Sequence, residues 1–418
     1  MKILWFTNTA SNASKEFNYN FTIGGGWISS LEILLVKEKS HELGICFFYN
    51  GSEYKKITKN GVNYYGLPLE KAGSLERIYN RHFNKLNDTQ SPYIDTVICD
   101  FKPDIIHVFG TEMGYGELLM NKFDKVLFHL QGLMAPYAEV YFPNGVNKKD
   151  ILKRTSIINI IRGISFYNHF HLFKCRAKRE IRIIKNWKYF SGRTDWDKNY
   201  IELLNPLAVY FHCEELLREH FFTSEWAAPS LTDNKNTIII GTTINPNIYK
   251  GLDLIYKVLN LLTGYSIKWK IFGLKEDDDL NKLVKNLLKI REPNGSLEFY
   301  GQIDAQVLIK ELKTCHFFVH PSYIDNSPNS VCEAMLLGMP VLCSSVGGIK
   351  SLITDKESGF LFNPYDQYDL AGLLVSLINN YGKAIEVGNK ARTVALKRHS
   401  PTEIMRVLND IYITIYND

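Results

Sequence analysis

The chain has 418 residues, of which 45% are hydrophobic, 13% aromatic and 22% charged, and its formal net charge is +5. This ordinary globular composition excludes a disordered, collagen-like or coiled-coil chain, and the length predicts two to three domains. No apolar run approaches the roughly 20 residues that a membrane span needs, so we expect neither a transmembrane helix nor a signal peptide. Seven scattered cysteines without a CxxC spacing predict reduced thiols and no bound metal.

The first half of the chain predicts a parallel α/β sheet. A buried strand is expected in KILWFTN, followed by a loop that ends in three glycines and by a helix from Trp27, where apolar residues recur at helical spacing. Further apolar strands are expected at 45–49, 96–100, 104–110 and 125–132. Strands separated by helical stretches are typical of a doubly wound parallel sheet.

The same rhythm restarts after a turn-rich linker at 224–236. We therefore expect a first domain over residues 1–230 and a second over 237–400, while the final helix, 401–418, could pack on either. Strands of the second domain are expected at 237–243, 269–273, 297–301, 316–322, 340–345 and 359–362, and helices at 251–262, 280–290, 305–313 and 331–338. Two such sheets facing one another would bind a ligand in the crevice at the carboxyl ends of their strands.

The most informative stretch runs from His320 to Gly348. A helix capped by Ser327, with Pro328 in its first turn, would direct free backbone N–H groups at a ligand, and such a helix start suits phosphate. Those N–H groups belong to Asn329, Ser330 and Val331. Asp325 would lie in the loop ahead of the helix and Glu333 about one turn inside it, where ionised carboxylates can accept hydrogen bonds from sugar hydroxyls.

DNSPNSVCEAMLLGMPVLCSSVGGIKSLI resembles the E-x7-E signature region of family-4 retaining glycosyltransferases of the GT-B fold, with the shorter Asp325 in place of the first glutamate. KPDIIHVFG, IGGGWISSLEILL, GTTINPNIYKGLDL and LFNPYDQYDLAGLL are similar to further motifs of that family, and SGRTDWDKNYIELLNP is similar to its polysaccharide-building members. The resemblance implies a GT-B architecture of two Rossmann-like domains facing across a cleft, with the acceptor on the first and a nucleotide-sugar on the second.

The resemblance also implies a nucleotide-diphosphate-sugar as co-substrate, with no other cofactor. Glu333 would bind the donor ribose, Asp325 would lie near the donor sugar, and Lys250 would stabilise the diphosphate, which gains negative charge as the bond breaks. Gly25 and Gly26 would let the backbone approach that diphosphate closely. Backbone groups of Asn326, Asn329, Ser330 and Val331 would line the donor.

Two departures from the family motifs affect the expected site. Thr242 and Thr243 stand where an arginine is expected before the lysine, so diphosphate stabilisation would rest on Lys250, helix ends and Arg193. Gln131-Gly132 replaces a histidine-glycine pair, and Gln131 would position the sugar by hydrogen bonds. The candidate catalytic residues are therefore Asp325, Lys250 and Gln131.

Plainer interpretations of these residues stay open. Asp325 and Glu333 could merely complement a helix dipole, Lys250 could be a solvated lysine, and the glycines could form an ordinary turn. His107 lies in an apolar strand, where a core histidine is the usual finding. No metal is expected.

The segment 148–188 carries twelve basic residues against Asp150 and Glu180, interleaved with apolar and aromatic residues. This pattern suits an anionic membrane surface, where a lipid-linked acceptor would be found. A pair of core-packing helices with solvated basic faces is the alternative. Nucleic acid is not an expected partner, because no recognition motif is present and the rest of the chain is net acidic.

The sequence thus predicts a cytoplasmic enzyme, peripheral on the inner face of the membrane. It would be a metal-independent, retaining glycosyltransferase that moves a sugar from a nucleotide-diphosphate-sugar to a saccharide or lipid-linked saccharide acceptor in surface polysaccharide assembly. The alternatives are a noncatalytic nucleotide- or saccharide-binding module of the same fold, and a GT-B epimerase or phosphorylase.

Overall fold

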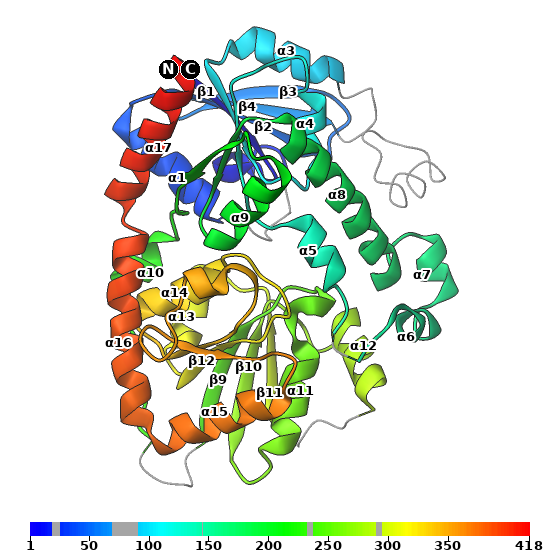
Figure 1. Cartoon of the computed structure of the whole chain (residues 1–418), viewed down its shortest axis with the longest axis vertical. Coiled ribbons are helices and arrows are strands. Elements are labelled where there is room, and N and C mark those ends of the chain that lie inside the picture. Colours follow the sequence, from blue (N-terminus) through cyan, green and yellow to red (C-terminus); the bar gives the residue numbers. More distant parts are fainter. Residues whose placement is uncertain (19–25, 69–90, 144, 232–236, 290–294) are drawn as a thin grey trace. The chain divides into compact units, whose positions relative to one another are not determined.

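The computed structural model describes residues 1–18, 26–68, 91–143, 145–231, 237–289 and 295–418 (Figure 1). Their contacts divide the chain into two compact units. Unit 1 comprises Met1–Ala138, Ile157–Leu216 and His399–Asp418, and unit 2 comprises Glu139–Ser156 and Leu217–Arg398. Residues 139–156 and 217–230, expected in the first domain, therefore group with unit 2.

Unit 1 is built on an eight-stranded sheet in the order β3-β4-β2-β1-β5-β6-β7-β8. All neighbouring strands are parallel except β3 and β4. The strands are β1 (Lys2–Thr7), β2 (Glu42–Tyr49), β3 (Lys55–Lys59), β4 (Val62–Pro68), β5 (Ile105–Phe109), β6 (Val126–His129), β7 (Tyr189–Gly192) and β8 (Val209–His212). The doubly wound α/β prediction is confirmed, with an antiparallel edge strand added.

One strand expected in unit 1 is wrong, because residues 96–100 lie in a helix. Ile94, Val97 and Phe101 are buried and recur at helical spacing, which outweighs the short apolar run VIC. The helices of this unit are α1 (Gly26–Glu38), α3 (Ser91–Phe101), α4 (Tyr115–Leu118), α5 (Met134–Glu139), α7 (Ile157–Ile161), α8 (Phe166–Asn186), α9 (Asp195–Leu204) and α17 (Pro401–Asn417).

The C-terminal helix α17 packs on the sheet of unit 1. The Tyr412 hydroxyl accepts a 3.1 Å hydrogen bond from Trp5 Nε1 on β1 and lies 2.8 Å from His107 Nδ1 on β5. Burial lowers the pKa of His107 to about 3, so this histidine is a neutral core residue. An amphipathic pattern does not reveal which core receives its apolar face, which is why the sequence left the partner of this helix open.

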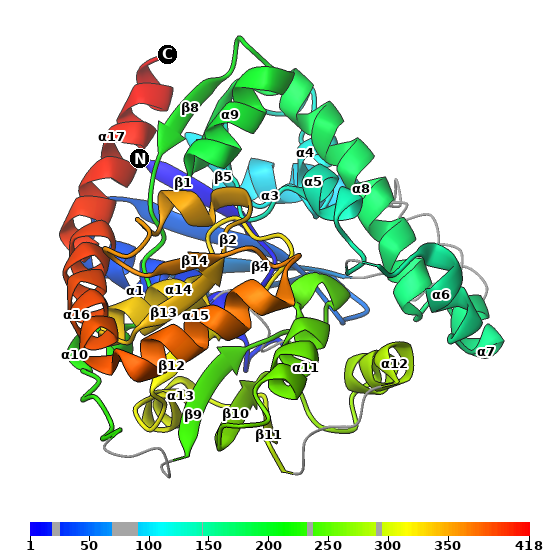
Figure 2. The same cartoon turned by 60° about the horizontal axis from the view of Figure 1, so that its bottom comes forward.

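Unit 2 contains a six-stranded, wholly parallel sheet in the order β11-β10-β9-β12-β13-β14 (Figure 2). Its strands are β9 (Ile238–Thr243), β10 (Ile267–Phe272), β11 (Leu297–Gly301), β12 (Phe317–His320), β13 (Val341–Ser344) and β14 (Phe360–Phe362). Its helices are α6 (Lys148–Lys153), α10 (Glu219–Thr223), α11 (Leu252–Leu261), α12 (Asp279–Leu288), α13 (Ala305–Leu312), α14 (Asn329–Leu337), α15 (Gln367–Asn379) and α16 (Tyr381–Arg398).

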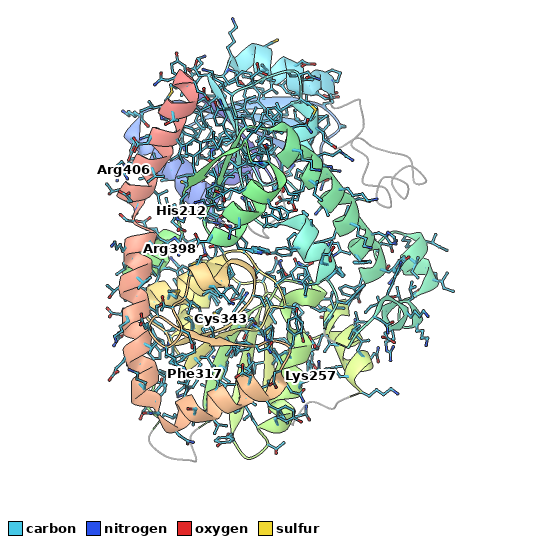
Figure 3. All side chains as sticks on the ribbon, viewed as in Figure 1. His212, Lys257, Phe317, Cys343, Arg398 and Arg406 are labelled. Carbon is cyan, nitrogen blue, oxygen red and sulfur yellow. The ribbon has the colours of Figure 1, made fainter. Side chains whose placement is uncertain are left out.

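The interior of unit 2 fixes the position of α14. Phe317 on β12 and Cys343 on β13 are fully buried (Figure 3), and Val331, Cys332 and Met335 of α14 belong to the same apolar cluster as Cys343. Burying this many apolar side chains favours one placement of the helix by several kcal/mol, at roughly 1.5–3 kcal/mol for each large side chain. The loop before α14 is thereby held at the carboxyl edge of the sheet.

Candidate functional site

Two loops of unit 2 meet at this carboxyl edge. β9 and β12 are adjacent and parallel, so the segments that follow them leave the sheet on the same side. The segment after β9 ends in a short 3₁₀ helix, Ile248–Lys250, whose Tyr249 carbonyl accepts a 2.8 Å hydrogen bond from the Tyr323 N–H in the other loop. Gly251 has a φ of +79°, and a Cβ there would come 2.0 Å from the Pro321 carbonyl oxygen, so glycine is required for this contact.

Lys250 and Asp325 form an ion pair between these two loops. Lys250 Nζ donates to Asp325 Oδ2 at 2.5 Å, and His320 Nε2 lies 2.9 Å from the same oxygen. Burial alone would raise the pKa of Asp325, but the charge of Lys250 and the hydrogen bond from His320 outweigh burial and hold this pKa well below its usual range. Asp325 is therefore an ionised acceptor and not a proton donor.

His320 is a site residue that the sequence analysis did not assign. It is the last residue of β12, and burial lowers its pKa, although Asp325 opposes this shift. A neutral ring that donates from Nε2 leaves Nδ1 as an acceptor, and Nδ1 is buried without a hydrogen-bond partner in the described part of the chain. Its position at the carboxyl end of a strand was the signal that could have identified it.

Helix α14 begins at Asn329, and Pro328 occupies the cap position without a side-chain hydrogen bond. The cap expected at Ser327 is therefore wrong by one residue. The Val331 N–H was expected to be free for a ligand, and this is wrong, because it donates to the Pro328 carbonyl at 3.0 Å. The N–H groups of Asn329 and Ser330 have no acceptor inside the helix. Asn326 is fully buried, and its N–H donates to Asp325 Oδ1 at 3.2 Å.

Glu333 lies one turn inside α14, as expected, and its carboxylate receives a two-pronged contact from Arg218. Arg218 Nε and Nη2 each donate at 2.7 Å, one to each carboxylate oxygen. Burial raises the pKa of the Glu333 carboxyl, and the Arg218 charge opposes that shift. Sequence reasoning missed Arg218 because it precedes Glu333 by 115 residues, a separation that no local spacing reveals.

These residues of unit 2 combine two kinds of binding group. The cations Lys250 and Arg218, with the amides at the start of α14, suit an anionic phosphate. The carboxylates of Asp325 and Glu333 suit hydroxyl groups.

Thr242 stands at one of the positions where the resemblance places an arginine, and it is buried. Its hydroxyl donates a hydrogen bond to the Val319 carbonyl and accepts one from Trp269 Nε1, both at 2.8 Å.

Arg193, a candidate for diphosphate binding, lies in the interior of unit 1. Its guanidinium forms an ion pair with the buried Glu215, and Nη2 donates to the Gln131 carbonyl at 3.0 Å. In this structure Arg193 therefore fixes the segment that carries Gln131, two residues after β6. A role for Arg193 on a diphosphate, and for Gln131 on a sugar, stays a prediction.

The glycine loop is described only from Gly26 onward. Gly26 is the first residue of α1, and Gly25 lies outside the described residues. Trp27, the next residue, lies 5.3 Å from the His129 ring between ring centroids. Burial, followed by the charge of Arg193, holds the pKa of His129 well below its usual value, so this imidazole is neutral.

Glu180 of α8 is a second residue that sequence reasoning did not identify. It is fully buried and accepts hydrogen bonds from the Thr111 hydroxyl at 2.6 Å and from the Met134 and Ala135 N–H groups at 3.0 and 3.2 Å. Burial raises its pKa to about 7 against these donors. Glu180 thereby ties the loop after β5 to the start of α5, close in sequence to Gln131.

Within the described ranges, no cluster of three or more His, Cys, Asp or Glu side chains is placed to hold a metal ion. Nor does any of the described helices combine the length and the apolar character needed to cross a bilayer.

The two Rossmann-like units define the GT-B fold, and solved structures share it along the whole chain. A sucrose-phosphate synthase from Thermosynechococcus elongatus aligns with a TM-score of 0.74 at 14% identity, covering 100% of this chain and 99% of that chain. Anabaena HepE, solved in complex with UDP-glucose, aligns with a TM-score of 0.67 at 13% identity, covering 98% and 99%. At these identities the likeness shows the fold, and it confirms the predicted fold class.

The C-terminal part of the chain also matches a sequence family. The model described as "Glycosyl transferases group 1" matches residues 224–394, which include Lys250, Asp325 and Glu333. This segment is therefore similar to the group 1 glycosyltransferases, in agreement with the family resemblance read from the motifs.

Individual relatives match over a similar stretch. An uncharacterized glycosyltransferase from Haemophilus influenzae is 28% identical over 166 residues, 39% of this chain and 45% of the relative. A poly(ribitol-phosphate) alpha-N-acetylglucosaminyltransferase from Staphylococcus aureus is 27% identical over 160 residues, 37% and 31%. The capsular polysaccharide biosynthesis glycosyltransferase CapM from Staphylococcus aureus is 22% identical over 179 residues, 40% and 44%. The chain thus spans less than half the length of each of these relatives.

Proposed function

We propose that this protein is a glycosyltransferase that moves a sugar from a nucleotide-diphosphate-sugar to a saccharide acceptor in polysaccharide assembly. The observation that carries the proposal is the paired arrangement of Lys250 with Asp325, beside the open amides of α14 and Glu333, within a group 1 glycosyltransferase segment. The HepE structure contains UDP-glucose, which supports this class of donor. The names of two relatives refer to poly(ribitol-phosphate) and to capsular polysaccharide, which supports a saccharide-polymer acceptor.

In the proposed reaction, the bond between the anomeric carbon and the diphosphate oxygen breaks, and an acceptor hydroxyl forms the new bond to that carbon. Asp325 is ionised, so it cannot protonate the departing diphosphate. The leaving group would instead be stabilised by Lys250 and by the N–H groups of Asn329 and Ser330, without a divalent ion. The acceptor proton would leave with the released diphosphate.

The two carboxylates would hold the donor through its hydroxyl groups, Asp325 on the transferred sugar and Glu333 on the ribose. Asp325 is fixed by Lys250 and His320 at Oδ2 and by the Asn326 N–H at Oδ1, so its carboxylate is held in a set direction. A sugar held in this way can receive the acceptor on the face that the diphosphate leaves. We propose retention of configuration on this basis and by analogy with the family.

We further propose that unit 1 docks on an anionic membrane surface, where a lipid-linked acceptor would be presented. Figure 2 shows α7 beyond the N-terminal end of α8. Four isoleucines in this region are more than half exposed: Ile157, Ile158, Ile161 and Ile164. Arg162 among them, and Lys174, Lys178 and Lys185 on the exposed face of α8, give the positive charge that anionic lipid attracts.

The structure narrows this membrane proposal to α7 and the outer face of α8. Most aromatic residues of the basic segment are buried instead, including Phe170, Phe173 and Trp187. The buried inner face of α8 agrees with the alternative of a core-packing helix, and the membrane proposal concerns only its exposed basic face.

Release of nucleoside diphosphate from UDP- and GDP-sugars tests the proposed activity. The full chain should release it faster when an oligosaccharide or lipid-linked saccharide acceptor is added. Binding without release would indicate a noncatalytic module, and conversion of the donor sugar without acceptor dependence would indicate an epimerase. Either result would reject the transferase assignment.

A further inference from the structure

The charges of the candidate donor site in unit 2 are already neutralised within the protein. Lys250 is paired with Asp325, and Arg218 is paired with Glu333. Each pair has no net charge. The neighbouring His320 ring adds none, because burial lowers its pKa and keeps it neutral. A pyrophosphate with two negative charges gains little from such a site unless at least one cation leaves its carboxylate.

The Arg218–Glu333 pair is the one that a nucleotide would have to open. The guanidinium occupies both oxygens of the Glu333 carboxylate, at 2.7 Å each. A ribose presents two neighbouring hydroxyl groups, and it binds a carboxylate most strongly when each hydroxyl reaches one oxygen. The two-pronged arginine contact and the ribose diol therefore compete for the same acceptor atoms.

Arg218 is also less confined by its surroundings than Glu333. The Glu333 side chain is 8% exposed on the buried helix α14, whereas the Arg218 side chain is 31% exposed. Arg218 belongs to no helix: it is an extended residue before the short helix α10, and its guanidinium lies 4.8 Å from the centre of the Phe221 ring. The ring face supports the cation without fixing its direction.

We propose that Arg218 is a phosphate-binding residue of the donor site, held on Glu333 until the ribose of a nucleotide takes its place. This inference rests on the proposed function. In a nucleoside diphosphate, the first phosphate is joined to the ribose through the 5′-oxygen, so a cation displaced by the diol lies within one side-chain length of phosphate oxygens. Arg218 and Lys250 would then share the diphosphate charge, and the two carboxylates would receive hydroxyl groups.

The test is calorimetric titration of the full chain with UDP, GDP and the corresponding free nucleosides, uridine and guanosine. The variants are Arg218→Gln and Arg218→Lys. Arg406→Gln is a matched control, because Arg406 makes a similar two-pronged contact with Glu403 on the exposed side of α17 (Figure 3). Melting curves of the free variants establish that they are folded.

For the nucleotide that the wild type binds, Arg218→Gln should weaken nucleoside diphosphate binding about tenfold or more. Binding of the free nucleoside should stay unchanged or tighten, because Glu333 no longer has a competing partner. Arg218→Lys keeps the charge and should retain more diphosphate affinity than Arg218→Gln; if the glutamine variant does not fold, the ratio of diphosphate to nucleoside affinity in Arg218→Lys decides. The Arg406→Gln control should match the wild type.

Equal losses for nucleoside and nucleoside diphosphate would overturn the proposal, since Arg218 would then only orient Glu333. An unchanged diphosphate affinity would overturn it as well. Failure of the wild-type protein to bind either UDP or GDP is a different result, because it would reject the proposed donor class itself.

Discussion

The Lys250 ammonium lies 2.5 Å from the Asp325 carboxylate, and both side chains are largely buried at the carboxyl edge of the unit 2 sheet. The same carboxylate oxygen also contacts His320 at 2.9 Å. This relationship joins the segment after β9 to the loop after β12. It makes Asp325 an anchor for Lys250 as well as a candidate sugar contact.

Asp325→Asn should separate the two roles of this carboxylate. The amide cannot neutralise Lys250, so UDP or GDP should bind as well as to the wild type or more tightly. Sugar transfer should fall by about two orders of magnitude, because the fixed negative charge near the sugar is lost. Steady-state kinetics and titration of the same preparation measure both effects. Wild-type turnover in Asp325→Asn would contradict the assignment.

Lys250→Ala should weaken binding of the nucleoside diphosphate about tenfold or more and lower turnover, since it removes a cation from the leaving group. Lys268→Ala is a suitable control on the same unit, because Lys268 forms a half-exposed pair with Glu298 at 2.8 Å. Equal effects of the two substitutions on binding and turnover would argue against a diphosphate contact by Lys250.

Glu180→Gln should flatten the dependence of stability on pH. The pKa of Glu180 is raised from 4.5 to about 7 in the folded state, so the folded chain holds a proton that the unfolded chain releases. The stabilisation is complete below about pH 4.5 and is lost as pH rises through about 7, by at most ~3 kcal/mol. Melting temperatures from pH 5 to 8 measure this slope. Glu403→Gln, a change at an exposed glutamate, is the control and should keep the wild-type slope. If Glu180→Gln also keeps that slope, Glu180 does not titrate in this range.

Arg193→Met should destabilise unit 1, because it leaves Glu215 buried without its cation. Removing one partner of a buried ion pair typically costs about 3–5 kcal/mol. Arg406→Met, which breaks an exposed pair on α17, should leave the midpoint of denaturant unfolding nearly unchanged. A variant of Arg193 with wild-type stability and lost nucleotide binding would instead support the role first expected from the sequence.

Replacing Ile157 and Ile161 together by serine should release the protein from anionic phospholipid vesicles, with binding weakened about tenfold or more. Leu203→Ser with Leu207→Ser is a matched control, because these leucines of unit 1 are 77% and 88% exposed. Co-sedimentation with phosphatidylglycerol and phosphatidylcholine vesicles measures the effect. Unchanged sedimentation of the isoleucine variant would reject α7 as the docking element.

The sequence alone predicted most of unit 2, because its strands and helices alternate with clear periodicity and Asp325 and Glu333 lie in one continuous loop and helix. It did not predict Arg218, Glu180 or the Arg193–Glu215 pair, because each depends on a partner brought near by folding. Residues 96–100 were misassigned because a run of three apolar residues, Val97 to Cys99, fits a strand or a helix equally well. The aromatic residues of 148–188 were linked to a membrane because a helix pattern does not distinguish a core-facing side from a lipid-facing one.

The most direct test of the donor site is titration of the wild-type protein and Glu333→Ala with a panel of UDP- and GDP-sugars. At least one of these donors should bind the wild type and raise its melting temperature. Glu333→Ala should remain folded and bind that donor about 100-fold more weakly, because the ribose loses a buried carboxylate partner. Binding of the donor to Glu333→Ala with wild-type affinity would contradict the account.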